Sequence, residues 1–310
     1  MKKAVFFLLT SVVLCSGCGT IEYQPDWIDS PDTRDASFDH PDYLVSARPA
    51  PSADAEFDKP VIIAVHGFTA STYEWEEFRA FAEDKGTALV SLVLLGGHGT
   101  SVEDFAKTTW RDWQKPVIDE YNALKAMGYR NISFVAASMG CALTLEAVMN
   151  SRIDPDGTLN QLIFIDPFIL PTDKNLYLID LMGAFITNVP YRDATEEEKK
   201  HSYVNRPSAT LRQLKSLVRK VEDQVLKGYT LPPGVGLTVY KAKVDEAASP
   251  ENAVFLQEHI RLADGTKPEI HMVDSDKHVF TRLQGRAAVT EKDRRLQVKT
   301  FDEILGKVMK

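Results

Sequence analysis

Short apolar runs alternate with longer amphipathic stretches from residue 60 onward. Six runs rich in Val, Ile, Leu and Ala have the length of strands: 61–65, 88–95, 132–136, 162–165, 237–242 and 270–273. Five other stretches have helical periodicity: 73–84, 110–127, 138–150, 250–262 and 292–308. Nearly continuous apolar strands separated by helices indicate a mostly parallel sheet with helices on both faces. The pattern therefore predicts an α/β fold in one domain over residues 60–310.

One interval between predicted strands, residues 167–236, is much longer than the others. It contains an apolar helical segment at 176–186. A second predicted helix carries apolar residues on one face: Leu211, Leu214, Leu217, Val218, Val221 and Val225. Helices inserted at the carboxyl end of a parallel strand lie where ligands bind in such sheets. We therefore expect residues 167–236 to form a small helical cap.

The first residues have the pattern of an export signal. Two lysines precede an apolar run over residues 4–14, which is too short to span a bilayer as a helix. Residues 14–18 read Leu-Cys-Ser-Gly-Cys and resemble a bacterial lipobox, in which the signal is cut before a cysteine that then receives acyl chains. The resemblance implies that residues 1–17 are removed and that Cys18 is lipidated. Cys15 is the alternative, but the bulky leucine before it suits the processing enzyme poorly.

Residues 18–59 would join this lipid anchor to the domain. They are rich in Pro and Asp and have no sustained periodicity, which predicts a tether or a loosely packed arm. Four aromatic residues could nevertheless dock this arm onto the domain: Tyr23, Trp27, Phe38 and Tyr43. Gly19 follows the lipidated cysteine, which by resemblance to enterobacterial sorting signals implies the outer membrane, facing the periplasm.

Charge and cysteine content exclude several kinds of partner. The formal net charge is -8, and the sequence has no run of basic residues of the kind that binds a phosphate backbone, so nucleic acid is not an expected partner. Lipidation at Cys18 would leave Cys141 as the one free thiol, so no internal disulfide is expected. We interpret Cys141 as a packed core residue. No cysteine pair at ligand spacing and no HExxH motif is present, so we predict no metal site.

Ser138 stands where a predicted strand passes into a predicted helix. Residues 135–140 read Val-Ala-Ala-Ser-Met-Gly and fit a G-x-S-x-G elbow, with Ala136 in place of the first glycine. In such an elbow a strained turn lifts the serine hydroxyl above the sheet, and small neighbours let the strand and helix backbones approach. The helix N-terminus adds positive potential where an oxyanion forms. We therefore predict that Ser138 is a nucleophile.

A serine nucleophile needs a base and an acid that orients the base. Both follow Ser138 in the order Ser, Asp or Glu, His, and both lie at the ends of predicted strands. Asp245 follows the strand at 237–242, and His278 lies in the loop after the last predicted strand. We predict His278 as the base and Asp245 as the acid.

Other residues compete for both roles. Asp166 ends the preceding strand and Glu246 is the immediate neighbour of Asp245, although Asp166 before a proline also fits an ordinary turn. His271 alternates within a predicted strand and His259 falls within a predicted helix, so packing or surface roles fit these two histidines better.

Two backbone N–H groups would stabilise the oxyanion. One comes from the residue after the nucleophile and the other from the loop after the first central strand, which are Met139 and Phe68. Gly67 permits the tight approach that such a loop requires. His66 ends the strand, and we expect it to hold the loop by hydrogen bonding.

Four motifs together resemble the carboxylesterase and monoacylglycerol lipase branch of the α/β-hydrolases, over about residues 60–305. They are His-Gly-Phe-Thr at 66–69, Gly-His-Gly-Thr-Ser at 97–101, Thr109 to Trp113, and Ala-Ser-Met-Gly at 137–140. The resemblance implies an α/β-hydrolase fold, supports Asp245 and His278, and makes His98 structural or substrate-facing. Lys277 departs from the glycine that this branch commonly has before its histidine.

The resemblance also implies an activity. A serine esterase or lipase would cleave short acyl esters or monoacylglycerol-like lipids through an acyl-enzyme intermediate and would need no cofactor. The same triad could serve an acyltransferase or a thioesterase. A lipoprotein that keeps the fold as a non-catalytic binding module is the alternative of a different kind.

Overall fold

The structure is a computed structural model that describes residues 24–30, 40–153, 156–170, 188–190 and 194–310. The predicted signal segment, Cys18 and the predicted helix at 176–186 lie outside these residues. Among the helices that are described, none combines the length and the apolar character that a membrane crossing requires.

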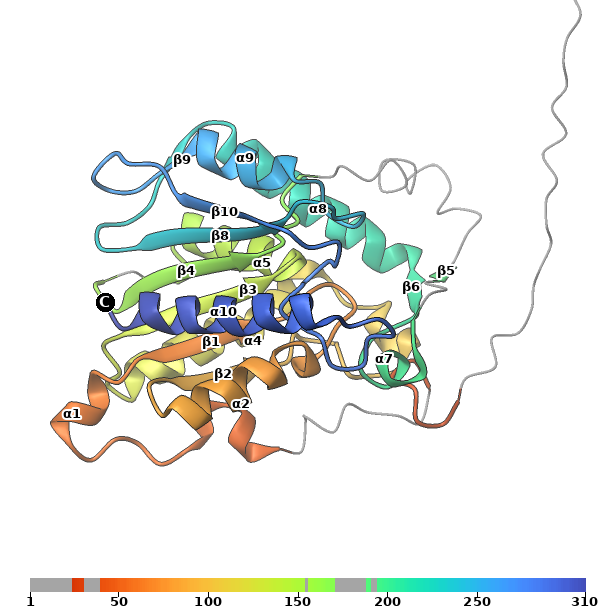
Figure 1. The fold of residues 1–310 in the computed structure, drawn as a ribbon, viewed down its shortest axis with the longest axis horizontal. Coiled ribbons are helices and arrows are strands. Elements are labelled where there is room, and N and C mark those ends of the chain that lie inside the picture. Colours follow the sequence, from red (N-terminus) through yellow and green to blue (C-terminus); the bar gives the residue numbers. More distant parts are fainter. Residues whose placement is uncertain (1–23, 31–39, 154–155, 171–187, 191–193) are drawn as a thin grey trace, which may run out of the picture.

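Six parallel strands form the central sheet, in the order β10-β8-β4-β3-β1-β2 (Figure 1). The strands are β1 (Val61–Val65), β2 (Leu89–Val93), β3 (Ile132–Ala137), β4 (Leu159–Ile165), β8 (Gly236–Ala242) and β10 (Glu269–Val273). Every residue of β1 and of β3 is buried, as expected for central strands that are covered on both faces. All six predicted strands and their parallel arrangement are therefore confirmed.

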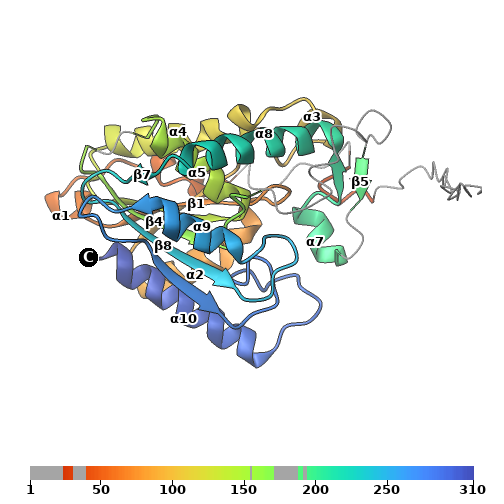
Figure 2. The same ribbon diagram turned by 90° about the horizontal axis from the view of Figure 1, so that it is seen from above.

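Helices cover both faces of the sheet (Figure 2). Along β1, Ile62 and Ala64 face the layer of α2 (Glu76–Lys85) and α10 (Glu291–Val308). The alternate residues face the opposite layer, because successive side chains of a strand point to opposite faces. That layer contains α4 (Trp110–Ala126), α5 (Met139–Met149), α8 (Ser208–Val225) and α9 (Glu251–His259). The predicted helices are confirmed to within a few residues.

Two of the long helices begin at capping boxes. The Thr109 side chain accepts from the Asp112 N–H at the start of α4 while the Asp112 carboxylate accepts from the Thr109 N–H. Thr290 and Asp293 repeat this exchange at the start of α10. Each box satisfies backbone groups that the first helical turn would leave unpaired, which explains why the helices start at these residues.

The long insert contributes short elements and one long helix. Its described elements are β5 (Asn188–Pro190), α7 (Glu196–His201), β6 (Asn205–Pro207), α8 and β7 (Tyr229–Thr230). β5 and β6 form an antiparallel pair, and β7 pairs with β9 (Ile260–Arg261). The apolar face of α8 packs into the same core cluster as α4 and α5, so this helix joins the layer on one face of the sheet. Shorter helical elements complete the described chain: η2 (Pro41–Tyr43), η3 (Val45–Ala47), α1 (Asp54–Phe57), η4 (Thr72–Trp75) and α3 (Val102–Phe105).

Parts of the expected tether pack against the domain. Val45 is fully buried and its N–H donates to Ser91 Oγ over 2.8 Å, while the Tyr43 hydroxyl donates to Glu76 Oε1 over 2.7 Å. Nearer the N-terminus, Ile28 and Asp29 are also fully buried. These residues are therefore not loosely packed, and Tyr43 docks on the domain as the alternative allowed. A segment without periodicity can still dock through a few well-placed side chains, which periodicity alone does not reveal.

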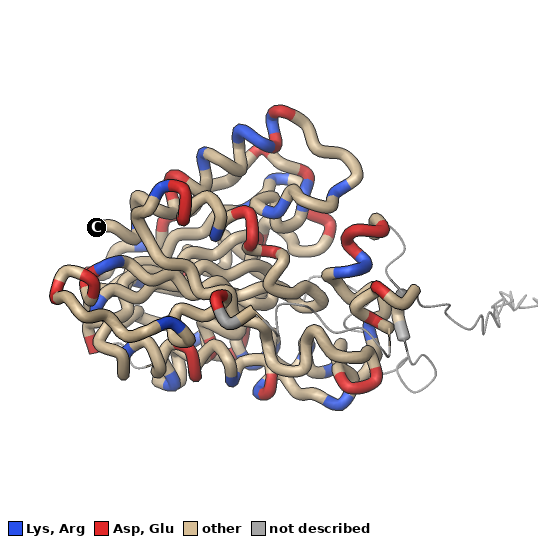
Figure 3. Tube along the Cα trace, turned by 90° about the horizontal axis from the view of Figure 1, so that it is seen from below, with Lys and Arg blue, Asp and Glu red and all other residues tan. Residues whose placement is uncertain are grey.

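Positively and negatively charged residues are interspersed along the described backbone (Figure 3). Many form exposed pairs between neighbouring turns, such as Lys115 with Asp119 and Lys199 with Glu196. Exposed pairs of this kind contribute about 0–1 kcal/mol each, so they solubilise the surface more than they stabilise the fold.

Candidate active site

Ser138 occupies a strained turn between β3 and α5. Its backbone has φ 50° and ψ −120°, a conformation that non-glycine residues rarely adopt. Gly140 makes the turn possible, because a Cβ atom at this position would lie 2.7 Å from the carbonyl oxygens of both Val65 and His66. The alanine at 136 is accommodated as a buried residue of β3. The elbow geometry predicted around Ser138 is therefore present.

Ser138 lines a cavity of about 300 Å³ at the carboxyl ends of the strands. Phe68 from the loop after β1, Met139 from the start of α5 and His278 from the loop after β10 line the same cavity. The insert supplies much of the remaining wall, through Tyr203, Val204, Arg206, Leu211 and Leu214. The described part of the insert thus borders the cavity, while its long helix α8 lies in the layer on one face of the sheet.

Asp245 and His278 are in direct contact. His278 Nδ1 lies 2.8 Å from Asp245 Oδ2, and the other carboxylate oxygen accepts the N–H groups of Ala247 and Ala248 at 2.9 and 3.0 Å. The Asp245 side chain has no exposed area, whereas the His278 side chain is 26% exposed and opens on the cavity. Burial raises the pKa of Asp245, but hydrogen bonds and charges from His278 and Lys241 outweigh burial, so its pKa lies below the usual value. A permanently ionised carboxylate can therefore hold one tautomer of the imidazole.

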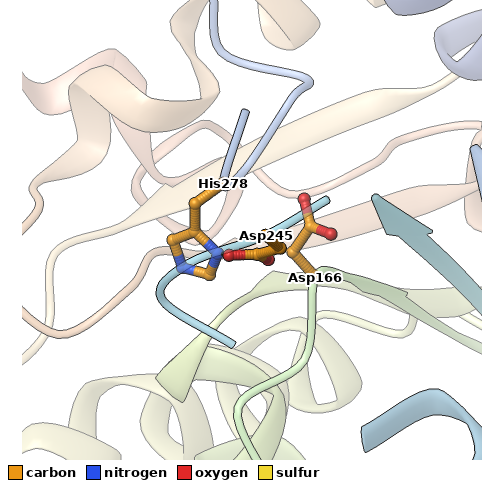
Figure 4. A group of neighbouring side chains, drawn as sticks. All are labelled: Asp166, Asp245 and His278. Carbon is orange, nitrogen blue, oxygen red and sulfur yellow. The ribbon is translucent and has the colours of Figure 1, made fainter. Parts of the chain in front are cut away.

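The rival acids have other partners. Asp166 is fully buried and accepts the Ala242 N–H at 2.7 Å, the Phe280 N–H at 3.3 Å and the Lys241 ammonium at 3.0 Å. Figure 4 shows the Asp245 carboxylate between the His278 ring and Asp166. Glu246 is exposed. The geometry favours Asp245 as the group that orients His278.

The rival bases are engaged away from the cavity. The His271 ring stacks on the Tyr240 ring with 4.7 Å between the centroids, and the His259 ring packs at 4.8 Å from that of Phe255. Neither histidine lines the cavity that contains Ser138.

The loop after β1 is held in place by buried polar and aromatic contacts. His66 Nε2 accepts the Leu95 N–H at 3.1 Å, and Nδ1 donates to the Gly67 carbonyl at 2.9 Å. Burial lowers the pKa of His66 to about 4, so the ring is neutral at pH 7 and serves as a brace for the loop, as predicted. The Phe68 ring packs against Trp113 at 5.6 Å between centroids, which fixes the backbone of this loop.

The two predicted oxyanion donors both border the cavity. Phe68 lies in the braced loop, and Met139 is the first residue of α5, whose N–H has no partner within the helix. His98 is fully buried with its ring 4.6 Å from that of Phe105, consistent with a structural place. Cys141 is also fully buried, and burial raises the pKa of its thiol, so its interpretation as a packed core residue is confirmed.

Sequence reasoning missed several charged residues of the cavity wall. Glu198 of the insert pairs with Arg282 at 2.6 Å, and the Arg286 guanidinium donates to the His278 carbonyl. Glu74 is buried beside the oxyanion loop, accepts the Gly67 N–H at 2.8 Å, and has its pKa raised by burial. These residues carry no local motif, because their partners come from distant parts of the chain.

Lys241 is a further residue that was missed. It is fully buried in β8, and its ammonium contacts both Asp166 and Asp245. A charged residue inside an otherwise apolar strand, four residues before the predicted acid, was the available signal. Asp166, Asp245 and His278 have ligand atoms within 4.8 Å of one another, a spacing that could hold a metal ion. The lysine already supplies a positive charge between the two carboxylates, so this cluster does not fit a cation site.

The profile of the alpha/beta hydrolase family matches residues 62–302. The chain belongs to the alpha/beta hydrolase family. One curated relative of this chain is a carboxylesterase of Bacillus subtilis (strain 168). The two sequences are 24% identical over 230 residues, and the alignment covers 72% of this chain and 86% of the relative. A second curated relative is the thermostable monoacylglycerol lipase of Bacillus sp. (strain H-257). It is 26% identical to this chain over 225 residues, and the alignment covers 71% of this chain and 83% of the relative.

Solved structures share the fold of this alpha/beta hydrolase. A structure from work on LipS and LipT, two metagenome-derived lipolytic enzymes, superposes with a TM-score of 0.64 at 18% identity, covering 81% of this chain and 94% of the other. The monoacylglycerol lipase of Paleococcus ferrophilus superposes with a TM-score of 0.60 at 10% identity, covering 81% and 97%. The family and the curated relatives together support an ester-cleaving hydrolase.

Proposed function

We propose that this alpha/beta hydrolase cleaves carboxylic esters through an acyl-enzyme intermediate. The observation that carries the proposal is that Ser138, on its strained elbow, and the hydrogen-bonded His278–Asp245 pair open on one cavity. Ser138 Oγ attacks the ester carbonyl carbon while His278 takes the hydroxyl proton and passes it to the leaving alcohol. Water then repeats the sequence and releases the acid. The N–H groups of Phe68 and Met139 stabilise the oxyanion in both steps.

The proposed substrates are short acyl esters or monoacylglycerol-like lipids. Relatives named carboxylesterase and monoacylglycerol lipase support this class. The cavity supports it as well, because its volume of about 300 Å³ is at the small end for ligand pockets and part of its wall is apolar, with Phe168, Leu211 and Leu214. Transfer of the acyl group to an acceptor other than water, or cleavage of a thioester, would use the same residues.

Active-site labelling tests the proposed function. The full-length protein, purified in detergent, is treated with a fluorophosphonate probe and assayed with p-nitrophenyl butyrate. We expect labelling and turnover in the wild type and the loss of both in Ser138→Ala. Ser133→Ala is the matched control, because this serine is buried in β3 and does not line the cavity. A folded wild type that neither labels nor turns over would instead support a binding module.

We also propose that Cys18 anchors the enzyme to the outer membrane by acyl chains, after removal of residues 1–17. The lipobox-like residues 14–18 support this. Residues 27–30 dock on the insert, where the Ile28 N–H donates to the Lys199 carbonyl at 3.0 Å. Eight residues lie between Cys18 and Trp27, and the nine residue steps that join them can span at most about 30 Å. Such an anchor would keep the cavity near the lipid surface, which suits a lipid ester as substrate.

Metabolic labelling with an alkyne fatty acid tests the anchor. We expect wild-type protein to carry the label and to remain in the membrane pellet after alkaline washing. Cys18→Ser should lose the label and leave the pellet, whereas Cys15→Ser should behave as wild type. Label retained by Cys18→Ser and lost by Cys15→Ser would move the anchor to Cys15.

A further inference from the structure

Four side chains form a continuous network of polar contacts behind the cavity. The His278 ring contacts Asp245, Asp245 contacts the Lys241 ammonium, and the ammonium contacts Asp166. The side chains of Lys241, Asp245 and Asp166 have no exposed area. Water therefore cannot compensate any of these three charges, and each depends on its neighbours.

Lys241 is placed to act on the triad through Asp245. Its ammonium donates to Asp245 Oδ2, the same oxygen that His278 Nδ1 contacts. The remaining oxygen, Oδ1, is occupied by the N–H groups of Ala247 and Ala248. The position and the charge of the oxygen facing the imidazole are thus set jointly by Lys241 and His278.

Asp166 connects this network of contacts to the loop that carries His278. Its carboxylate accepts the Ala242 N–H at the end of β8 and the Phe280 N–H two residues after His278. Lys241 places a positive charge between Asp166 and Asp245, two buried carboxylates that both accept from its ammonium.

We propose that Lys241 is a positioning residue of the active site, which acts with Asp166 to fix the charge and the direction of Asp245 toward His278. The inference rests on the proposed triad. Two carboxylates and one ammonium leave a net charge of one negative beside the imidazole. Removing either Lys241 or Asp166 changes that net charge in opposite directions, which a purely structural role would not predict.

The test compares three variants of the full-length protein in detergent. Lys241→Met leaves two negative charges beside His278 and should stabilise the imidazolium. Asp166→Asn leaves no net charge and should destabilise it. The double variant Asp166→Asn/Lys241→Met restores one negative charge. We expect the midpoint of the His278 titration to rise by about one pH unit in the first variant, fall by about one in the second, and return to the wild-type value in the third.

The midpoint is read from the ring Cε1–H resonance of His278 by NMR, assigned with His278→Gln. The acid limb of the pH profile of kcat/KM for p-nitrophenyl butyrate should move in the same directions. Other charged groups near His278 are unchanged in all three variants, among them Glu74 of η4 and, after His278 in the chain, Arg282 and Arg286. Their influence therefore cancels in the comparison.

Opposite shifts with recovery in the double variant support the proposal. Equal midpoints in wild type and Asp166→Asn would overturn it, and so would shifts of the same sign in both single variants. If Lys241→Met does not fold, Asp166→Asn and the double variant still decide the question. The NMR reading does not depend on turnover, so an inactive wild type would contradict the proposed function without affecting this test.

Discussion

The two walls of the cavity are held in different ways. The loops that carry Ser138 and Phe68 follow fully buried strands and rest on the apolar core of the sheet. The insert is held in two ways: α8 packs its apolar face into that core, whereas the segment before α8 makes polar contacts with distant parts of the chain. The Tyr203 hydroxyl accepts the Thr100 N–H at 2.9 Å, and Glu198 pairs with Arg282 at 2.6 Å.

The two walls also carry different groups: the sheet side carries the residues proposed to react, and the insert carries residues that would surround the substrate. Close packing of apolar side chains tolerates little displacement, so it holds the proposed nucleophile and the proposed oxyanion donors firmly in place. Individual polar contacts contribute about 1 kcal/mol each, so residues in the segment before α8 can change without disturbing the chemistry. We infer that the sheet side sets the reaction and that the insert sets which ester enters.

The largest expected effect comes from the sheet side. Asp245→Asn should lower the turnover of p-nitrophenyl butyrate by roughly 10⁴-fold, because an amide no longer holds the imidazole in the required tautomer. The circular dichroism spectrum should be unchanged.

Glu246→Gln is the matched control for this substitution, since this neighbouring carboxylate is exposed. It should retain normal turnover. Normal activity in Asp245→Asn would instead move the orienting acid to another carboxylate.

The second prediction concerns the insert and the N-terminal segment that docks on it. Asp29 Oδ2 accepts the N–H groups of Val204 and Asn205 at 3.2 and 2.9 Å, and burial raises the pKa of Asp29 from 3.8 to about 6. The folded state therefore holds this proton more tightly than the unfolded state. Its contribution to stability is full below pH 4 and is lost as the pH rises through 6, amounting to roughly 3 kcal/mol.

Urea denaturation at pH 4.5 and pH 7 measures this linkage. Asp29→Asn should lose the part of the pH dependence that Asp29 contributes, because an amide does not titrate. Asp26→Asn is the control, since the side chain of Asp26 is 61% exposed and pairs only loosely with Lys200 at 3.7 Å. Identical pH dependence in wild type and Asp29→Asn would exclude Asp29 as the titrating group.

The smallest expected effect tests the packing beneath the elbow. Gly140→Ala should lower the free energy of unfolding by about 1–3 kcal/mol, because the added methyl group meets two backbone oxygens at 2.7 Å. Displacement of the elbow should also slow fluorophosphonate labelling of Ser138.

Gly306→Ala in α10 is the control, since no atom lies within 4 Å of the added methyl group. Removing a helical glycine should stabilise the protein by about 0.4–1 kcal/mol. Equal stability of the two variants would show that strand and helix can separate at the elbow without cost.

The sequence determined the sheet, its helices and the residues at the elbow. Strands such as β1 are apolar along their whole length, and α4 and α10 have both helical periodicity and a capping box, so local pattern and tertiary role agree. Ser138, Asp245 and His278 were predictable because each follows a recognisable strand in a recurring order. That Ser138 and His278 line one cavity, and that Asp245 contacts His278, needed only the rule that the carboxyl ends of parallel strands meet at one edge.

Tertiary structure alone decided which groups lie behind Asp245. Asp166 and Asp245 both follow strands, and only the folded chain shows that Lys241 lies between them. It also decided that Asp29 docks on the insert 175 residues away. Contacts between single polar side chains have no periodicity and depend on distances across the fold. The periodic spacing of apolar residues can be seen in the sequence itself. These polar contacts form only when folding brings distant segments together.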